Sequence, residues 1–251
     1  MNSVAGVRGL GILGRGFVGA LLPVQCAGCR AWDEVLCPSC RSLASGPAHV
    51  ASIDGVRGPL PLVVMGDYDG PLRRIVLAAK HSARTDLSDF LDEAGARLGT
   101  ALGGVLGVAG SPAAAVGSLE GRAPSTGGAV EVWVVPAPSS WKRRLRGRQV
   151  ALPLARAVAR AVAAGARPGV RVRVVDAVRL RIGATSQSGK AGAQRTVGRM
   201  GSMYALAVPG PGVLVVAVDD VVTTGATIRE MERVLGGIDA VAAICRPGLI
   251  T

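Results

Sequence analysis

The sequence lacks an apolar run long enough to cross a membrane, although hydrophobic residues make up 49% of its 251 residues. A membrane-spanning helix needs roughly twenty consecutive apolar residues, so the sequence predicts none. Charged residues are also scarce, at 18%. A chain of this length and composition can bury a substantial core. Disorder is therefore excluded as its main state, and we expect a soluble, globular protein.

Cysteine is almost absent from the long C-terminal part of the chain. Four of the five cysteines lie between Cys26 and Cys40, and only Cys245 follows them. A secreted protein stabilised by disulfides distributes its bridges across the fold. The observed distribution instead predicts a reducing compartment, and we expect the protein to be cytoplasmic. Cys245 stands in an apolar context, which favours a buried, small hydrophobic side chain.

Acidic residues are few, because 17 Asp and Glu stand against 29 Lys and Arg, for a formal net charge of +12. This excess favours polyanionic partners such as phosphate-bearing metabolites or nucleic acid, although solubility alone also explains it. Lysine is rarer still, and the only three are Lys80, Lys142 and Lys190. We attribute the arginine bias to overall composition rather than to function.

The first 24 residues carry an apolar pattern that Arg15 interrupts. Spacings of three and four predict a short amphipathic helix over residues 1–24, with these apolar residues on one face: Leu10, Leu13, Phe17 and either Leu21 or Leu22. The interruption, together with the lack of a small-residue cleavage pattern, leads us to expect no secretory signal peptide here. Packing on the rest of the fold is favoured over binding to a membrane surface.

Residues 25–45 contain two CxxC pairs separated by seven residues, formed by Cys26, Cys29, Cys37 and Cys40. Each CxxC turn supplies two thiolates from one tight loop, and four thiolates close a tetrahedral structural zinc site. The spacing therefore predicts a zinc knuckle in a segment too small to hold its own core. A redox dithiol and a site that no longer binds metal are the alternatives.

The most informative stretch begins at Val213. A continuous β-branched run over residues 213–218 predicts a parallel strand that is buried on both faces. Two carboxylates, Asp219 and Asp220, follow it, and then a turn of small residues and threonines leads into a helix. Ligands of open α/β sheets bind at the carboxyl ends of strands, and the N–H groups of a turn entering a helix bind phosphate. Paired carboxylates suit vicinal hydroxyls, so the pattern predicts a ribose 5-phosphate site. Capping of the next helix by the acidic pair is the plain alternative.

The stretch from Val213 to Thr227 resembles the phosphoribosyl pyrophosphate (PRPP) signature of type I phosphoribosyltransferases. The resemblance implies that Asp219 and Asp220 hold the 2- and 3-hydroxyls of the ribose. It also implies that one loop grips the 5-phosphate, through Thr223, Thr224, Gly225, Ala226 and Thr227. Magnesium would accompany PRPP, because it keeps several waters and few protein ligands.

With the cysteine pairs in front and this loop behind, the whole chain resembles the ComF family, which is associated with competence for DNA uptake. The segment 65–87 is similar to the family's tyrosine-led strand and following helix. The resemblance makes Lys80 a candidate pyrophosphate ligand and catalytic residue; a solvated lysine at a helix C-terminus, favoured by the dipole, is the alternative. Arg195 is a further candidate catalytic cation, in a loop that closes over the reacting centre in such transferases.

A basic loop follows the strand that we expect at residues 130–135. It contains one aromatic residue and five cations, namely Trp141, Lys142, Arg143, Arg144, Arg146 and Arg148. Cations beside an aromatic can follow the phosphates of single-stranded DNA and stack a base. They can equally bind pyrophosphate or form a solvated loop. Arg146 to Val150 departs from the family's usual Arg-Gly-Phe-Asn-Gln, so roles tied to the missing aromatic and amide do not carry over.

The expected fold is α/β, with a phosphoribosyltransferase-type parallel sheet flanked by helices and a small N-terminal zinc-knuckle segment. The phosphoribosyltransferase-like domain is expected over residues 55–251, with a flexible, chemically inert insertion at 103–129. Strands are expected near 61–66, 130–135, 172–179, 202–207, 213–218 and 240–245.

Three functions remain open at this stage. The first is transfer of ribose 5-phosphate from PRPP, or from a nucleotide-like relative, to a nitrogen nucleophile. The second is a non-catalytic protein that handles single-stranded DNA together with the DNA-uptake machinery. The third is a purine salvage or regulatory transferase unrelated to DNA uptake.

Overall fold

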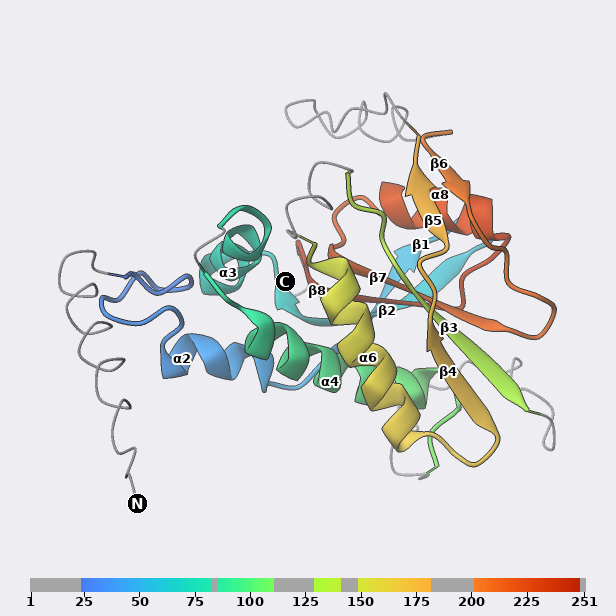
Figure 1. Cartoon of the computed structure of the whole chain (residues 1–251), viewed down its shortest axis with the longest axis horizontal. Coiled ribbons are helices and arrows are strands. Elements are labelled where there is room, and N and C mark those ends of the chain that lie inside the picture. The colour runs from blue at the N-terminus through green and yellow to red at the C-terminus, as the bar shows by residue number, and fades with distance from the viewer. Residues whose placement is uncertain (1–23, 83–84, 111–128, 141–148, 182–200, 249–251) are drawn as a thin grey trace, which may run out of the picture.

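The computed structural model describes residues 24–82, 85–110, 129–140, 149–181 and 201–248 (Figure 1). Its helices are α2 (Pro38–Arg41), the short 3-10 helix η1 (Ser42–Ala44), α3 (Gly70–His81), α4 (Ser88–Val105), α6 (Ala151–Gly165) and α8 (Ala226–Leu235). Its strands are β1 (His49–Asp54), β2 (Pro59–Asp67), β3 (Val130–Pro136), β4 (Val170–Val174), β5 (Val178–Leu180), β6 (Met203–Ala205), β7 (Leu214–Val221) and β8 (Ala240–Arg246).

Six strands form one sheet in the order β1-β2-β8-β7-β3-β4. Strand β1 runs antiparallel to β2, whereas the other neighbouring pairs are parallel. The remaining strands, β5 and β6, pair antiparallel as a separate ribbon. The expected α/β fold with a mostly parallel sheet and flanking helices is confirmed.

The central strand β7 shows why the sheet needs cover on both sides. Val216 and Val218 belong to the core beneath one face of the sheet, and Val215 and Ala217 belong to the core beneath the other. Because side chains alternate along a strand, a strand buried on both faces requires an uninterrupted apolar run. The apolar run at residues 213–218, which predicted this strand, is thus explained by the central position of β7 in the sheet.

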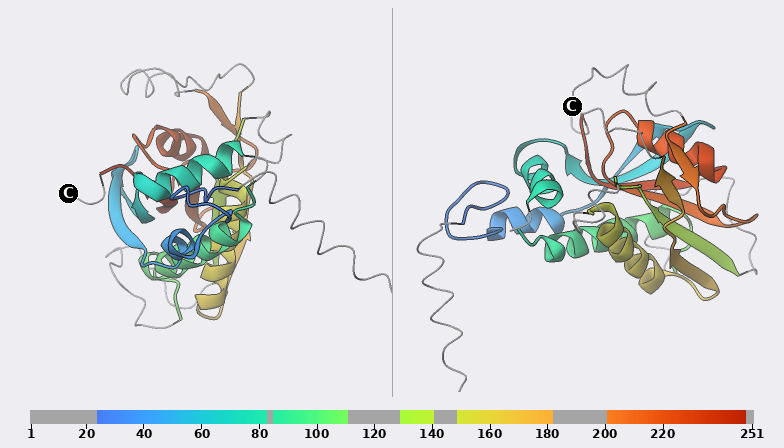
Figure 2. Two further views of the ribbon diagram at one scale, coloured as in Figure 1. Left: turned by 90° about the vertical axis from the view of Figure 1, so that its left-hand side faces the viewer. Right: turned by 45° about the horizontal axis from the view of Figure 1, so that its top comes forward.

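The two faces of the sheet carry different helices (Figures 1 and 2). Helices α4 and α6 pack on one face, through buried residues that include Leu98, Leu102, Leu154 and Val158. Helix α8 covers the other face through Ile228, Met231 and Leu235, in a core that also contains Val178 of β5 and Met203 of β6. The apolar spacing of three and four in α8 is the pattern of an amphipathic helix.

The chain changes direction between β3 and β7. From β3 it passes through α6 to β4 at one edge, and from β7 it passes through α8 to β8 on the opposite side. Since β3 and β7 are neighbours, a crevice opens between their carboxyl ends, where open α/β sheets bind ligands.

Several expectations about local structure need correction. The strand expected over 172–179 is two strands, β4 and β5, in different sheets, because the chain leaves the main sheet at residues 175–177. Strand β1 was not expected; it extends the sheet upstream of residue 55. Helix α4 was not expected either, and it occupies the first three residues of the stretch expected to be an insertion, 103–105. The remainder of that stretch from 111 to 128, and the expected helix except for residue 24, lie outside the described residues.

Two buried carboxylates of α8 fix other elements to this helix. Glu232 is 2% exposed and accepts hydrogen bonds from the backbone N–H groups of Val56, at 2.6 Å, and Arg57, at 3.3 Å. Glu230 is 3% exposed and accepts from the N–H of Met203 in β6 and from the guanidinium of Arg233. Burial alone would raise the pKa of Glu230, but Arg233 and Met203 outweigh it, so this pKa lies below its ordinary value of 4.5.

We expect Glu230→Gln to lower the free energy of unfolding by about 1–2 kcal/mol at pH 7, because a charged acceptor is lost at a buried site. Because the pKa of Glu230 is lower in the folded protein than its ordinary value of 4.5, the ionised carboxylate stabilises the fold fully above pH 4.5. This stabilisation is lost as the pH falls below that value. The difference between wild type and variant in urea unfolding should therefore shrink in acid. Glu93→Gln, which removes a surface ion pair with Arg97, should change stability by less than about 0.5 kcal/mol; a pH-independent Glu230→Gln difference would contradict the assignment.

Candidate functional site

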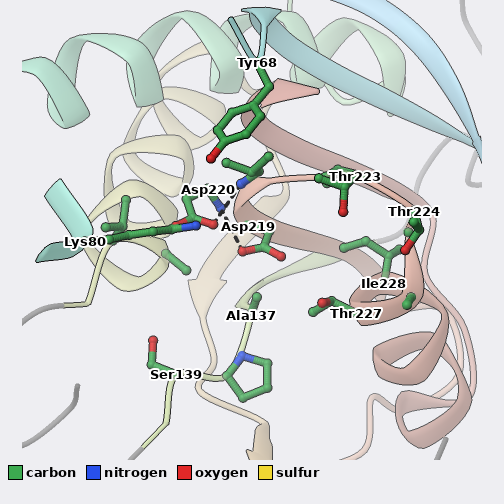
Figure 3. Close-up of a pocket in the computed structure, with 17 residues that line it drawn as sticks. Tyr68, Lys80, Ala137, Ser139, Asp219, Asp220, Thr223, Thr224, Thr227 and Ile228 are labelled. Atoms are coloured by element: carbon green, nitrogen blue, oxygen red, sulfur yellow. Dashed lines mark hydrogen bonds and ion pairs between the residues drawn. The ribbon is translucent and has the colours of Figure 1, made fainter. Parts of the chain in front are cut away.

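A cavity of about 340 Å3 opens at the carboxyl ends of β3 and β7 (Figure 3). It lies at the point where the chain reverses direction in the sheet. Its lining comes from four parts of the chain: the end of β2, the end of α3, the β3–α6 connection and the turn between β7 and α8. The sequence-predicted residues in this lining are Lys80, Asp219, Asp220, Thr223, Thr224, Gly225, Ala226 and Thr227.

The two carboxylates occupy the end of β7 rather than the loop after it. The strand continues to Val221, and Asp219 is in register with Ala243 of β8. The carboxylate of Asp219 accepts a hydrogen bond from the N–H of Asp220, and that of Asp220 accepts one from the N–H of Val221, both at 2.8 Å. The backbone thus orients both side chains, and the expectation that the strand ends at residue 218 is wrong by three residues.

Lys80 reaches this pair from a distant part of the sequence. Its Nζ lies 2.7 Å from Oδ2 of Asp220, and the two side chains are 19% and 11% exposed. Lys80 stands in the last turn of α3, where the helix dipole favours a cation. Figure 3 shows its side chain lying along the cavity toward the carboxylates. Lys80 is therefore directed into the site and not into open solvent.

The turn after β7 presents hydroxyls and backbone donors, and it lies across the carboxylates from Lys80 (Figure 3). Thr223 and Thr224 are exposed, and the ten-residue helix α8 begins directly after Gly225. Gly225 has φ of +69°, a left-handed conformation that glycine adopts without a steric penalty. The first N–H groups of a helix have no partner within the helix, so this turn can hold an anion.

Two residues of the lining, Tyr68 and Ser139, were not predicted as site residues. In Figure 3 the hydroxyl of Tyr68 points toward the carboxylate pair, and Ser139 lies on the other side of the cavity. The guanidinium of Arg73 stands 5.5 Å from the centroid of the Tyr68 ring. Tyr68 directly follows β2 and Ser139 lies three residues after β3. Both are therefore at the edge where parallel strands end, which was the available signal.

The other predicted site residues fall outside the described part of the chain. They are Trp141, Lys142, Arg143, Arg144, Arg146, Arg148 and Arg195. Val150 and Ala151, which follow the basic loop in the sequence, do line the cavity.

The four N-terminal cysteines form a separate cluster. The sulfurs of Cys26, Cys29, Cys37 and Cys40 all lie within 4.8 Å of one another. A zinc ion with four thiolates at about 2.3 Å in a tetrahedron needs sulfurs about 3.8 Å apart, and the sulfurs of Cys29 and Cys37 are 3.5 Å apart. The four thiols can therefore hold a zinc ion, as the spacing of the two pairs predicted.

The thiols of the cluster differ in their ease of ionisation. Burial opposes ionisation of Cys26, but N–H groups of Cys37, Cys29 and Gly28 stabilise its thiolate and lower its pKa to about 6. Burial raises the pKa of Cys40 instead. Metal binding requires all four thiols to be deprotonated, so loading with zinc releases protons.

Cys245 is not part of this cluster. It is fully buried in the core on the α4 and α6 side of the sheet, and burial raises the pKa of its thiol to about 12. The expectation of a buried, small hydrophobic side chain is confirmed. All five cysteines are free thiols.

Among the described residues, no helix has both the length and the apolar character needed to cross a membrane. Neither a scan against models of known protein families nor a search of curated proteins matched this chain. The site must therefore be interpreted from its own chemistry.

We expect Gly225→Ala to destabilise the protein more than Gly236→Ala does. Both glycines have positive φ, +69° and +81°, where an alanine costs about 1–2 kcal/mol. A Cβ on Gly225 would also meet Cδ1 of Ile53 at 2.6 Å, whereas a Cβ on Gly236 has no neighbour within 4 Å. Overpacking adds about 1–3 kcal/mol, so chemical denaturation should separate the variants by at least about 1 kcal/mol; equal losses would refute the close packing of the turn.

Proposed function

We propose that this protein is a ComF-like phosphoribosyltransferase-domain protein whose cavity binds PRPP, or a related ribose 5-phosphate, together with magnesium. The observation that carries the proposal is the convergence of three groups in one cavity at the switch point of the sheet. These groups are the carboxylates of Asp219 and Asp220, the threonine-rich turn before α8, and the ammonium of Lys80. We further propose that the protein is cytoplasmic and that the cysteine cluster holds a structural zinc ion.

The arrangement fits the ligand in two parts. The 5-phosphate would accept hydrogen bonds from the N–H groups at the start of α8 and from the hydroxyls of Thr223, Thr224 and Thr227. The carboxylates of Asp219 and Asp220 would accept hydrogen bonds from the 2- and 3-hydroxyls of the ribose. Both carboxylates are already oriented by backbone N–H groups, so little ordering is needed on binding.

Transfer would use the cations near the anomeric carbon. A nitrogen nucleophile forms a bond to that carbon while the bond to pyrophosphate breaks, and the nucleophile's proton passes to solvent. Charge accumulates on the leaving pyrophosphate, so fixed cations lower the barrier. Lys80 is placed to supply one, and Arg195 and Arg143 are proposed as others. Magnesium supplies further neutralisation when it is bound with PRPP.

The pair between Lys80 and Asp220 implies an exchange on binding. Lys80 and a ribose hydroxyl would compete for the carboxylate of Asp220, whose Oδ2 lies 2.7 Å from the ammonium. Anionic ligand would draw the ammonium away from the carboxylate and toward pyrophosphate. Without ligand, Lys80 and Asp220 neutralise each other's charge. With ligand, pyrophosphate would become the anionic partner of Lys80, and a ribose hydroxyl would donate to Asp220.

We expect calorimetry with PRPP and magnesium to show binding by the wild-type protein and a loss of about tenfold or more in affinity for Asp220→Asn. The loss follows from a hydrogen bond to a charged group, worth about 1.5–3 kcal/mol. Affinity for inorganic phosphate, which would use only the turn before α8, should not fall in this variant.

The matched control is Asp92→Asn, because Asp92 is a surface carboxylate on α4 whose side chain is 59% exposed and paired with Arg160. It should bind PRPP as the wild type does. No heat from the wild-type protein with PRPP and magnesium would refute the proposed function, and equal loss in both variants would refute the role of Asp220.

Handling of single-stranded DNA, with the DNA-uptake machinery as partner, is the second candidate function. It is favoured by Trp32, whose side chain is 58% exposed on the cysteine segment beside exposed Arg30 in the sequence. In the sequence, Trp141 and the five cations of residues 142–148 add a further aromatic residue and positive charge, the residue types that bind single strands.

If the five cations of residues 142–148 contact DNA phosphates, the logarithm of affinity for a labelled oligonucleotide should fall with log salt at a slope of roughly −3.5. This corresponds to a loss of roughly 100-fold between about 50 and 200 mM salt. Arg143→Gln should reduce the slope by roughly 0.7, whereas Arg97→Gln on α4 should leave it unchanged. An affinity that does not respond to salt would exclude this function.

A further inference from the structure

Helix α3 connects the two sites that the sequence presents separately. Its last turn carries Lys80 into the cavity, and its first half lies against the cysteine cluster. We propose that the four-cysteine cluster, through Arg74 and α3, positions Lys80, so that zinc at the cluster and an anionic ligand in the cavity favour each other's binding. The part of this inference that concerns the ligand rests on the proposed function.

The contact between the cluster and α3 is close and polar. The guanidinium Nε of Arg74 donates a hydrogen bond to the carbonyl oxygen of Gly28, which lies between Cys26 and Cys29. A Cβ on Gly28 would stand 2.5 Å from Sγ of Cys40 and 3.2 Å from Cδ1 of Ile75. The first CxxC turn therefore packs directly against both the other cysteine pair and α3.

Three buried residues anchor α3 in the protein. Its buried residues are Leu72, Ile75 and Val76, and they share one core with Cys26 and Cys40. Figures 1 and 2 show α3 between the cysteine segment and the end of the sheet. Tertiary packing supplies most helical stability. With three buried residues, α3 therefore depends on its contacts with the cysteine segment and with the sheet for its position.

A shift of α3 at the cysteine cluster would also move Lys80 in the cavity. Arg74 and Lys80 are six residues apart on one helix, which is about 9 Å along its axis. The ion pair at the far end measures 2.7 Å, and a shift of about 1 Å would take it beyond hydrogen-bond distance. Loss of the metal would free the CxxC turn that receives Arg74, and the end of α3 would lose its fixed position.

Coupling of this kind is reciprocal. If zinc increases the affinity for ligand by some factor, the ligand increases the affinity for zinc by the same factor. Typical couplings change affinity by about 5–150-fold. Arg74 is a positioning residue, since it does not line the cavity, and its effect should depend on the metal.

The first test needs no ligand. Zinc is removed from the wild-type protein with a chelator, and hydrogen exchange by mass spectrometry is compared for peptides covering residues 70–81 and 226–235. We expect exchange in 70–81 to accelerate by at least about fivefold while 226–235, which is α8, is unchanged. Unchanged exchange in 70–81 would overturn the proposal. Equal acceleration in both peptides would also overturn it, because the metal would then stabilise the whole domain.

The second test measures zinc release to a zinc-selective chelator with and without PRPP and magnesium. Ligand should slow release by at least about fivefold in the wild type, and this effect should disappear in Lys80→Met and Arg74→Met. The control is Arg97→Met, on the surface of α4, which should behave as the wild type. Slowing that persists in Lys80→Met would show that the coupling does not pass through Lys80 and would overturn the proposal.

The two proposals can fail separately. If calorimetry shows that the wild type binds PRPP but zinc release does not respond, the coupling is wrong and the proposed function stands. If PRPP does not bind, the proposed function is wrong, and hydrogen exchange alone decides whether the metal positions α3.

Discussion

The position of strand β7 in the middle of the sheet determines most of the site. The strand is hydrogen-bonded to β3 on one edge and to β8 on the other, and its side chains enter a core on each face. A strand enclosed on all sides cannot slip without exposing apolar surface or breaking backbone hydrogen bonds. Because Asp219 and Asp220 are the last polar residues of this strand, their backbone is as firmly fixed as the core. Two carboxylates are thereby held next to each other although their charges repel.

Such a pair of carboxylates needs a nearby cation. Asp220 is 8% exposed, and removing a charge from water is costly unless a partner of opposite sign is present. Lys80 supplies that partner at 2.7 Å. The requirement is electrostatic and does not depend on ligand, so Lys80 and Asp220 pair without one.

The sequence predicted the parts of the site that are local in the chain. The apolar run, the acidic pair, the threonine turn and the following helix are contiguous, so their pattern alone located β7 and α8. The pairing of Lys80 with Asp220 could not be derived in this way, because it joins residues 140 positions apart and depends on how α3 packs. The family resemblance named Lys80 as a candidate ligand but gave no partner for it.

Tertiary packing also explains the errors in the expected elements. Residues 172–179 contain four valines, which favours a strand. The chain nevertheless leaves the sheet after Val174 and forms a new strand that pairs with Met203–Ala205. Helix α4 contains Gly95, Gly99, Gly103 and Gly104, residues that disfavour helices locally. It forms because Gly95 and Gly99 permit close approach to α6, where an added Cβ would meet atoms of α6 at 2.4–2.6 Å. Neither outcome can be obtained from propensity alone.

The two walls of the cavity therefore differ in what stabilises them. The wall made by β7 and α8 belongs to the central sheet, and its turn is fixed by the left-handed conformation of Gly225. The wall that carries Lys80 belongs to α3, a helix at the end of the sheet with three buried residues and a hydrogen bond to the cysteine segment. The carboxylates and the turn before α8 thus belong to the central sheet, whereas the cation belongs to a peripheral helix. A cluster of four thiols that can bind zinc is the feature best suited to give that element rigidity, since the segment around it has too few apolar residues to form a core of its own.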